Sequence, residues 1–563
     1  MTTSTDIAPR KNPSELLARI GWAVLICSTL YVCYFSHLGA IGFVGPDEPR
    51  YAWIARDMAE TGDWVTPRLY GKPWFEKPPL YYWGAAISFK LFGVSEAAAR
   101  LPSAISALLA TLALAWLAWR IYGAETARWL LLLLPTTVGM IGFSHAAATD
   151  MPFSAMLTIA MVCAAVVVGL VPDESCRDVA QHAAPHRSES NVARRRWLAL
   201  ILFGFFLGLA VLAKGPAGII LCGGAVFFWA LFTKRWRDAL RLFHPAAIIT
   251  FCATALPWYI LCARRNPNFF RIFIIEHNFK RYLTSEFQHI QPFWFYGPIL
   301  IAALLPWSTF LVPLIWDERK SFQNRLEAGR GMFFISFSTI PIIFFTLSKS
   351  KLPGYILPAI PPLVLLCSDC AKKMLVTNSR LTRALLGSSA MAAIVLVALA
   401  IRYSQHFREL APFPAIIYDA PMNIGPLRLL GYVLGLSALV LVFFHRSRVG
   451  LVCTAAALVA VLGSATLANF DLALSPRQAS QAISKMMNGD VEVLSCEVPR
   501  PAIYGFNFYV HHEISEWRPR RSEGRTVIVV GQPSCLDAIK NANYSLRAEV
   551  DFPKWTLVEV EAR

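Results

Sequence analysis

Residues 44–83 read VGPDEPRYAWIARDMAETGDWVTPRLYGKPWFEKPPLYYW, a charged and aromatic stretch that directly follows a long apolar run. The surrounding chain is oily, because hydrophobic residues make up 56% of its 563 residues and the mean hydropathy is +0.47. Charges beside a bilayer are costly unless they stay hydrated or find partners, and they mark functional sites. A merely solvated loop, the alternative, does not account for the tryptophans and tyrosines between the charges. We therefore expect a functional site in this stretch.

The length and hydrophobicity predict a polytopic α-helical membrane protein. We expect the run 20–43 to stay in the protein as a signal anchor, since it is too long for the apolar part of a signal peptide. The segment 79–95 is short for a span and carries Lys90, which favours an interfacial helix. Apolar runs then predict about thirteen transmembrane helices, at 20–43, 98–119, 129–146, 151–171, 197–213, 216–233, 243–262, 294–316, 331–347, 353–370, 384–401, 427–444 and 449–468.

The basic residues indicate the orientation of these spans. With a cytoplasmic N-terminus, most basic loops fall on the cytoplasmic side, as the positive-inside rule requires. These loops contain Arg187, 194–196, 234–237, Arg319, Lys320, Lys372, Lys373, Arg380, Arg383, Arg446 and Arg448. An odd number of spans then places the C-terminus on the outer, periplasmic face. The formal net charge is +17, and because these cations flank spans we expect anionic lipid headgroups, not nucleic acid, as their partners.

The hydropathy falls at about residue 470, which predicts two domains. Residues 1–469 form the transmembrane domain, in which 44–97 is the first periplasmic loop with interfacial helices, and 470–563 form a small soluble α/β domain. Within it we expect a helix at 475–489 and strands at Val491–Cys496, Ala502–Val510, Thr526–Gly531 and Trp555–Val560. Cys496 and Cys535 pair as a disulfide if the compartment is oxidising. Two free thiols are the alternative.

Three acids are candidates for catalysis. Asp47 and Glu48 follow the first span, and the flanking Pro46 and Pro49 are expected to hold them extended. Asp150 lies in another outer loop, where a helix cap is the alternative role. Acids on two outer loops can converge on one cavity, so we expect these side chains to share a site.

Cations on the same face predict an anionic ligand, although snorkelling to outer headgroups is the alternative. Lys77 is a point-charge phosphate binder beside Glu76, with a surface ion pair as the other reading. A divalent metal is not required, but Glu76 near a histidine is one place for it. The expected substrate-binding residues are Arg50, Tyr51, Glu76, Lys77, Lys349, Lys351 and Tyr355.

Five motifs give these residues a family context. They are the acid pair at 47–48, FEKPPLYYW at 75–83, TDMP at 149–152, AKGP at 213–216 and KSKLPGYILPAIPP at 349–362. Over about residues 15–370 the chain resembles the bacterial lipid A aminoarabinose transferases, which are C-type glycosyltransferases. The resemblance implies an inner-membrane enzyme of Gram-negative bacteria. Such an enzyme moves 4-amino-4-deoxy-L-arabinose from undecaprenyl phosphate to lipid A phosphates on the periplasmic face, which gives resistance to polymyxin and cationic peptides.

The resemblance also implies the partners: an undecaprenyl phosphate-linked aminosugar donor, a lipid A acceptor and membrane lipids. We expect a monomer that needs no cofactor. Lys77, Arg50 and the Lys349–Lys351 turn are expected to stabilise the departing phosphate. A related transferase with another sugar or acceptor remains an alternative. A transporter or flippase for lipid-linked sugars is the other, and it predicts charges within the spans and inverted repeats.

Overall fold

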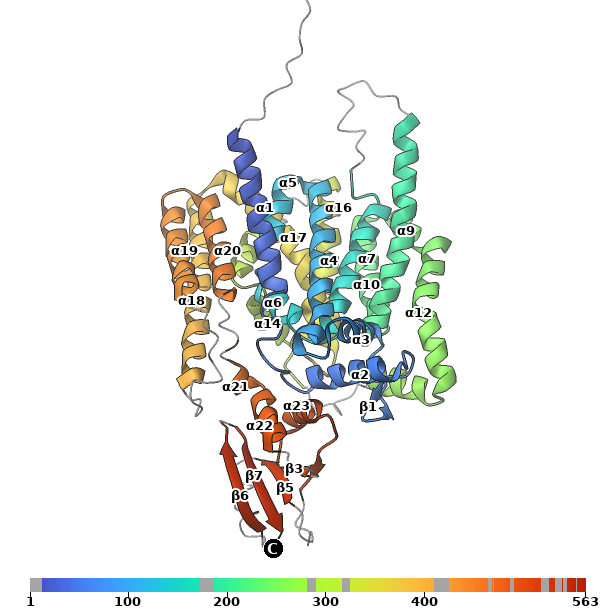
Figure 1. The fold of residues 1–563 in the computed structure, drawn as a ribbon. Coiled ribbons are helices and arrows are strands. Elements are labelled where there is room, and N and C mark those ends of the chain that lie inside the picture. Colours follow the sequence, from blue (N-terminus) through green and yellow to red (C-terminus); the bar gives the residue numbers. More distant parts are fainter. Residues whose placement is uncertain are drawn as a thin grey trace, which may run out of the picture.

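The computed structural model describes most of the chain, with gaps at both ends and between elements. The described residues are 13–172, 186–280, 290–315, 325–409, 425–463, 468, 470–486, 491–517, 526–531, 539, 544–552 and 554–562. Arg319, Lys320 and Cys535 lie outside them. Helices dominate, and a small sheet follows them at the C-terminal end of the chain (Figure 1).

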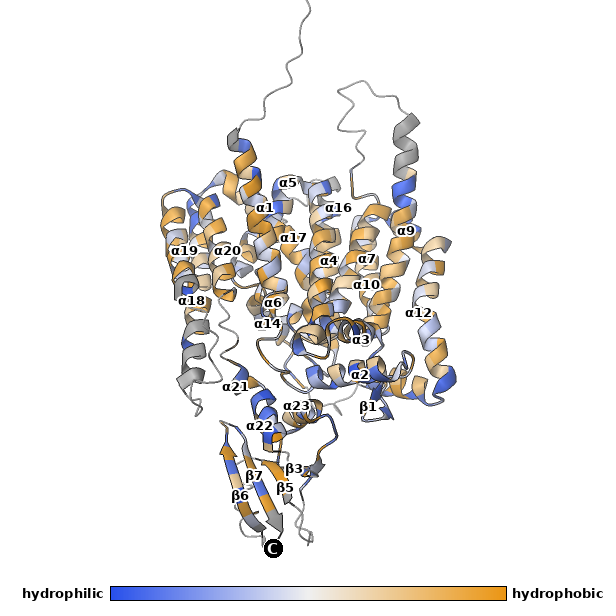
Figure 2. Cartoon of the chain, viewed as in Figure 1, coloured by the Kyte–Doolittle hydropathy of each residue, from blue (hydrophilic) through white to orange (hydrophobic). Residues whose placement is uncertain are grey.

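Long apolar helices run side by side and form the bundle (Figure 1), and their apolar residues form a broad band across it (Figure 2). Among the described residues, eight helices are long and apolar enough to cross a membrane, or up to ten if two bent pairs count as one span each. The chain is therefore a multi-pass membrane protein. Every predicted span is helical over most of its length, but the count of about thirteen stays a prediction. The helices of the bundle are α1 Pro13–Tyr34, α4 Glu96–Tyr122, α5 Ala124–Leu133, α6 Val138–Ser144, α7 Asp150–Val167, α9 His186–Lys214, α10 Ala217–Thr233, α12 Pro245–Arg265, α14 Tyr296–Leu304, α16 Arg325–Leu347, α17 Ile360–Thr377, α18 Arg380–Glu409, α19 Gly425–Phe443 and α20 Ser447–Leu462.

Two of the predicted spans are broken. Helices α5 and α6 meet at 63°, and α14 meets the helical turns of 307–315 at 110°. The prolines of 353–362 change the type of helix within another span, and irregular backbone at membrane depth is tolerated where it lines a cavity. There the 3₁₀ helix η4 Pro353–Ala359 precedes α17. Short connecting helices are α11 Trp236–Leu240, η1 Arg241–Phe243, the π-helix η2 Arg271–Lys280 and η3 Trp307–Phe310.

The first loop folds differently from the expectation near its start. The first span ends at Tyr34 instead of residue 43, and residues 47–61 form helix α2 (Asp47–Thr61). The extended conformation predicted around Pro46 and Pro49 is therefore wrong. Pro49 lies in the first turn of α2, where a missing backbone N–H costs no helical hydrogen bond. The acid pair thus opens a helix, whose N-terminal dipole favours negative charge.

The rest of this loop lies across one end of the bundle, which we call the sheet-side end (Figure 1). A short hairpin pairs β1 Arg68–Leu69 with β2 Lys72–Pro73. The predicted interfacial helix is confirmed as a helix, α3 Leu80–Phe92, which has 13 residues and packs beside α2. It begins after Glu76 and Lys77, which lie in the preceding turn and not at its start. Neighbours in a turn can face one another, unlike neighbours on a helix, so these two side chains form an ion pair.

The C-terminal region carries a five-stranded sheet in the order β4-β3-β5-β7-β6. The β3–β4 and β3–β5 pairs are parallel, and β7 is antiparallel to both β5 and β6. The predicted helix and three of the predicted strands are confirmed, and Cys496 is disulfide-bonded. The elements are α21 Asp471–Leu474, α22 Arg477–Met486, β3 Glu492–Cys496, α23 Arg500–Val510, β4 Ser515–Glu516, β5 Thr526–Gly531, β6 Tyr544–Asp551 and β7 Thr556–Ala562.

One predicted strand is wrong, because Ala502–Val510 lies within helix α23. Pro501 stands in the first turn of α23, where its fixed backbone angle suits a helix. The helix buries Phe506 and Phe508, and it packs against both α2 and α22. Tertiary packing thus overrides the strand preference of the aromatic residues. Strands β4 and β6 were not predicted.

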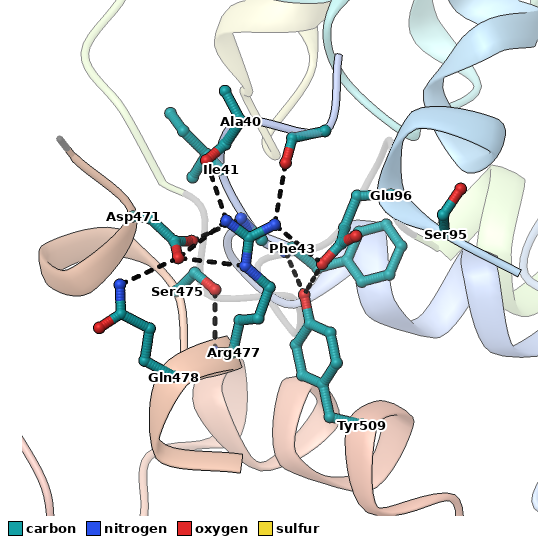
Figure 3. Close-up of polar contacts among 12 residues, drawn as sticks. Ala40, Ile41, Phe43, Ser95, Glu96, Asp471, Ser475, Arg477, Gln478 and Tyr509 are labelled. Atoms are coloured by element: carbon teal, nitrogen blue, oxygen red, sulfur yellow. Dashed lines mark hydrogen bonds and ion pairs between the residues drawn. The ribbon is translucent and has the colours of Figure 1, made fainter. Parts of the chain in front are cut away.

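Arg477 joins this region to the bundle (Figure 3). Its guanidinium forms ion pairs with Asp471 at 2.8 Å and Glu96 at 3.3 Å. It also donates to the carbonyls of Gly39 and Ala40, both at 2.9 Å. Tyr509 adds to the junction, since its hydroxyl donates to Glu96 at 2.8 Å and accepts from the Phe43 amide at 2.9 Å. Helices α22 and α23 are therefore held against residues 39–43 and the start of α4 by an ion pair and hydrogen bonds.

Candidate functional site

Glu48 is buried at the first turn of α2, and its carboxylate is fully engaged. Arg100 of α4 binds it through two nitrogens, at 3.0 and 2.8 Å. The backbone amides of Val44 and Ala147 donate to the same carboxylate at 2.8 and 2.7 Å. Glu48, predicted as catalytic, therefore holds three segments together: the loop start, α4 and the turn before α7. The geometry fits a positioning role better than contact with substrate.

Arg50 is the centre of the second group of charges. Its buried guanidinium donates to Glu76 at 3.0 Å, to the Pro46 carbonyl at 2.9 Å and to Asp47. Burial lowers the pKa of Arg50, but nearby groups, chiefly the Glu76 carboxylate, outweigh it and hold the pKa above its ordinary value. Arg50 therefore keeps its charge, although its nitrogens already face the acids of its own loop.

Rings enclose the same guanidinium. The centroids of Tyr51, Trp74 and Tyr504 lie 5.8, 5.7 and 5.3 Å from the Arg50 Cζ atom, within the range of cation–π attraction. Tyr504 belongs to α23, so the C-terminal region completes this cage. Sequence alone did not reveal Tyr504, because its partner lies several hundred residues earlier in the chain.

Asp47 lies at the exposed edge of this network, and Lys77 lies at a half-buried edge. The Asp47 side chain is 46% exposed, whereas that of Glu76 is 8% exposed. The Lys77 Nζ atom lies 3.6 Å from a Glu76 oxygen, and its side chain is 13% exposed. Asp47 thus offers a carboxylate to a ligand. Lys77 follows two residues after Phe75, which belongs to the apolar cluster that also contains Trp258.

Tyr82 is a functional candidate that sequence reasoning did not select, although it lies in the FEKPPLYYW motif. Its hydroxyl is buried and has no hydrogen-bond partner among the described residues. Burial first, and the Glu76 charge second, raise the pKa of Tyr82 well above its ordinary value. Its ring contacts Tyr51, with centroids 5.8 Å apart. Tyr82 therefore carries an unused hydrogen-bond donor beside the Arg50–Glu76 pair.

A second acid–base pair lies at the start of α7. Asp150 forms a short ion pair with Lys214, the last residue of α9. The Lys214 ammonium also lies 4.6 Å from the centre of the Tyr355 ring. Thr149, not Asp150, occupies the N-cap position of α7, and its side chain makes no capping hydrogen bond. Asp150 therefore serves Lys214 instead of the alternative role as a cap.

Gly354 shows how tightly η4 packs against this pair. A Cβ atom at Gly354 meets an Asp150 oxygen at 2.8 Å and the Phe143 ring at 2.8 Å. Any larger residue therefore displaces the acid or the ring. The turn at residues 351–355 is therefore held next to Asp150.

The two lysines of this turn differ in their surroundings. Lys351 is buried and donates to the Gln291 carbonyl at 3.1 Å, whereas Lys349 is exposed. The hydroxyl of Ser350 between them is buried and has no partner in the described chain. In the predicted phosphate-binding turn, the Lys351 ammonium is therefore already bonded to a backbone carbonyl, whereas Lys349 lies at the surface.

The hydrogen bond from the Ala147 amide to Glu48 joins the two loops that carry the acids. Asp47 directly precedes Glu48, and Asp150 lies three residues after Ala147. The loop is fixed from the other side by α12, where the Trp258 indole donates to the Val65 carbonyl at 2.9 Å and Arg265 binds Asp63 at 3.0 Å. The structure thus brings the acids of two loops to one end of the bundle, on a braced frame.

Metal-binding groups of three or more His, Cys, Asp or Glu side chains do not occur in the described part of the chain. Glu76, the predicted place for a divalent ion, faces the cations of Arg50 and Lys77 instead. These two positive groups already neutralise its carboxylate. A metal at Glu76 has to displace them.

Comparisons with known proteins place this site in context. Residues 22–273 match the model of the family described as dolichyl-phosphate-mannose-protein mannosyltransferase. That range contains all the candidate site residues except Lys349, Lys351 and Tyr355.

Curated relatives extend the match. The undecaprenyl phosphate-alpha-4-amino-4-deoxy-L-arabinose arabinosyl transferase of Edwardsiella ictaluri (strain 93-146) is 30% identical over 385 residues, which cover 67% of this chain and 65% of that protein. The protein of the same name from Serratia proteamaculans (strain 568) is 31% identical over 354 residues, or 62% of this chain and 59% of its own length. The chain thus spans less than two thirds of the length of these relatives.

The solved structures agree in fold over nearly the whole chain. The crystal structure of ArnT from Cupriavidus metallidurans bound to undecaprenyl phosphate superposes with a TM-score of 0.71 at 22% identity, over 96% of this chain and 98% of that one. The chain therefore matches the model of the dolichyl-phosphate-mannose-protein mannosyltransferase family over residues 22–273, is similar in sequence to the undecaprenyl phosphate-aminoarabinose transferases, and has the fold of ArnT.

Proposed function

We propose that this chain is a membrane glycosyltransferase that moves 4-amino-4-deoxy-L-arabinose from undecaprenyl phosphate to phosphate groups of lipid A, and so gives resistance to polymyxin and cationic antimicrobial peptides. The names of the curated relatives support the donor and the sugar. The observation that carries the proposal is the group of Asp47, Arg50, Glu76 and Lys77 on the first loop. This group offers both an exposed carboxylate and a half-buried ammonium.

In the proposed reaction, an oxygen of the acceptor phosphate attacks the anomeric carbon of the sugar. The bond from that carbon to the undecaprenyl phosphate oxygen breaks, and its electron pair leaves with the phosphate. The acceptor phosphate has a second pKa near 6, so it is largely ionised at neutral pH and needs no strong base. Direct displacement with inversion is the simplest course. No cofactor is needed for this balance.

The residues divide into binding and positioning roles. Lys77 stabilises the charge that develops on the departing phosphate, with the unused hydroxyl of Tyr82 as a second donor. Asp47 orients the acceptor or stabilises the positive charge of the sugar, and the Asp150–Lys214 pair acts at the other side of the site. Glu48 and Arg50 hold this arrangement in place, because their polar atoms are already bonded within the protein.

We place the protein in the inner membrane as a monomer, with the sheet-side end in the periplasm. The cations at the opposite end of the bundle support this orientation. A reporter fused after Arg563 is expected to report periplasm, and one fused after Arg195 to report cytoplasm. Two reporters on the same side contradict the orientation.

Mass spectrometry of lipid A tests the function, using cells with and without the gene. Addition of one aminoarabinose mass per modified phosphate, only in cells with the gene, supports the proposal. A different sugar mass points to a related transferase. Unchanged lipid A, together with a changed distribution of the lipid-linked sugar across the membrane, favours a flippase. A flippase fits the structure less well, because the charges of the site lie on loops at one end of the bundle.

A further inference from the structure

A groove lies far from this site, at the opposite end of the bundle, between α1, α5 and α20. Its volume is about 560 Å³. Helix α1 lies at the periphery of the bundle: within its most apolar stretch, 11% of the residues are buried in the protein. The residues that line the groove are Ala18, Gly21, Trp22, Leu25, Glu125, Arg128, Trp129, Arg448, Val449 and Val452.

The polar part of the groove favours an anion. Arg128 is exposed and makes no ion pair with any described residue. Arg448 pairs with Glu125 at 3.4 Å, a contact in which both side chains stay partly exposed. Two arginines thus face one carboxylate, and this surplus of positive charge suits a phosphate group, which arginine binds in a fork geometry.

The other part of the groove is apolar. Trp22 and Trp129 form one wall, with ring centroids 5.4 Å apart in an edge-to-face contact. A Cβ atom at Gly21 meets no other atom within 4 Å, so the groove is open at this position. The Trp129 indole N–H is buried, and it has no acceptor among the described residues. A ligand that carries both hydrocarbon and oxygen atoms fits this lining better than a free phosphate.

The lining residues come from the first turns of α5 and α20 and the first half of α1, so they lie at one end of the membrane band (Figure 2). Tryptophans are enriched at this depth, where headgroups meet acyl chains. Basic pockets between transmembrane helices are known to hold anionic lipid headgroups. We propose that this groove binds one anionic glycerophospholipid, with its phosphate at Arg128 and Arg448 and an acyl chain along Gly21, Leu25 and Val452.

The test titrates phosphatidylglycerol onto the delipidated full-length protein and counts bound lipids by native mass spectrometry. Each arginine removed near a lipid surface weakens binding by about fivefold, so Arg128→Gln combined with Arg448→Gln should weaken the tightest site by more than tenfold in total. Gly21→Phe should block the same site, since the new ring enters open space. Arg237→Gln is the matched control, because Arg237 is an exposed arginine on α11 outside the groove.

Equal phosphatidylglycerol affinity in the wild-type protein and the double arginine variant overturns the proposal. So does equal affinity in Gly21→Phe, provided that its thermal unfolding matches the wild type. A competition arm adds undecaprenyl phosphate: displacement of phosphatidylglycerol at an equal or lower concentration assigns the groove to a polyprenyl phosphate and also overturns the assignment. Failure to compete supports it.

Discussion

Arg100 and Glu48, 52 residues apart in sequence, form a two-contact ion pair inside the protein, at 3.0 and 2.8 Å. Arg100 also donates to three backbone carbonyls, those of Leu38, Ile41 and Gly42. These five contacts connect the end of the first span, the first turn of α2 and the start of α4. The pair therefore fixes where Asp47, the neighbour of Glu48, stands relative to the bundle.

Breaking this pair is expected to destabilise the protein. Removing one partner of a buried ion pair costs about 3–5 kcal/mol, because the other charge stays buried. Arg100→Ala should cost more than Glu48→Gln, since it also leaves three carbonyls without their donor. Thermal unfolding in detergent measures both, with Arg120→Ala at the far end of α4 as the control. An Arg100→Ala variant as stable as the wild type contradicts a bracing role.

Asp47→Asn separates catalysis from stability. The Asp47 side chain is 46% exposed, so the variant should fold normally, while sugar transfer falls by about 100-fold or more if its charge stabilises the transition state. Asp150→Asn should also lose transfer, but it frees the buried Lys214 ammonium and should lower stability too. Glu60→Gln, an exposed acid on the same helix, is the control. Wild-type transfer by a folded Asp47→Asn protein removes this acid from the mechanism.

The sequence predicted the apolar segments well, because hydropathy is a local property of some twenty residues. It also predicted which loops carry charge. It did not reveal Arg100 or Tyr504, since each acts on a residue from a distant segment. It placed Lys214 in the AKGP motif but did not predict its ion pair with Asp150. An arginine in the first turns of a span is itself a signal, because charges within spans are rare and functional. That rule, applied to Arg100, is the one that could have found it.

The tail shows a different limit. Residues 502–510 carry isoleucine, tyrosines and phenylalanines, which favour strands, so the local pattern pointed to β structure. Packing against α2 and α22 stabilises this segment as a helix. These packing partners lie far away in the sequence, so the residues of the segment alone do not reveal them. The position of Pro501 was the local clue that favoured a helix start.

Lys77→Ala is expected to weaken the binding of undecaprenyl phosphate. Losing a charge-assisted contact with a partly desolvated phosphate costs on the order of 2–3 kcal/mol, which corresponds to roughly 30- to 150-fold in affinity. Binding to the purified protein in nanodiscs measures this. Lys72→Ala is the matched control, since Lys72 is an exposed lysine of the same loop. Unchanged affinity in Lys77→Ala moves the donor phosphate elsewhere, with the Lys349–Lys351 turn as the next place to test.

Arg477→Ala is expected to release the C-terminal region from the first loop (Figure 3). The variant loses ion pairs to Asp471 and Glu96, together with two carbonyl contacts. Hydrogen exchange in α22 and α23 should therefore rise, while the membrane helices stay unchanged. Lys485→Ala, an exposed cation on the same helix, is the control. If exchange in α23 is the same in both variants, Arg477 does not hold the two parts together.

The last prediction concerns pH and the contact between α2 and α23. His511 directly follows α23. Its Nδ1 atom lies 3.0 Å from an Arg56 nitrogen, and its Nε2 atom lies 3.8 Å from a Glu60 oxygen. Partial burial, and then the Arg56 charge, lower the pKa of His511 below its ordinary value, while Glu60 opposes this shift. The docked state therefore binds fewer protons than the undocked state, so docking should weaken as the pH falls through about 6.5.

Hydrogen exchange in α23, measured between pH 8 and pH 5 and corrected for intrinsic exchange rates, should show this loss of protection. His511→Asn should reduce the dependence, because asparagine tolerates the left-handed backbone at this position, where φ is 68°. His445→Asn is the matched control: His445 also has a positive φ, of 64°, but it lies in the turn before α20, away from α23. A pH dependence that persists unchanged in His511→Asn assigns the effect to other groups at the junction.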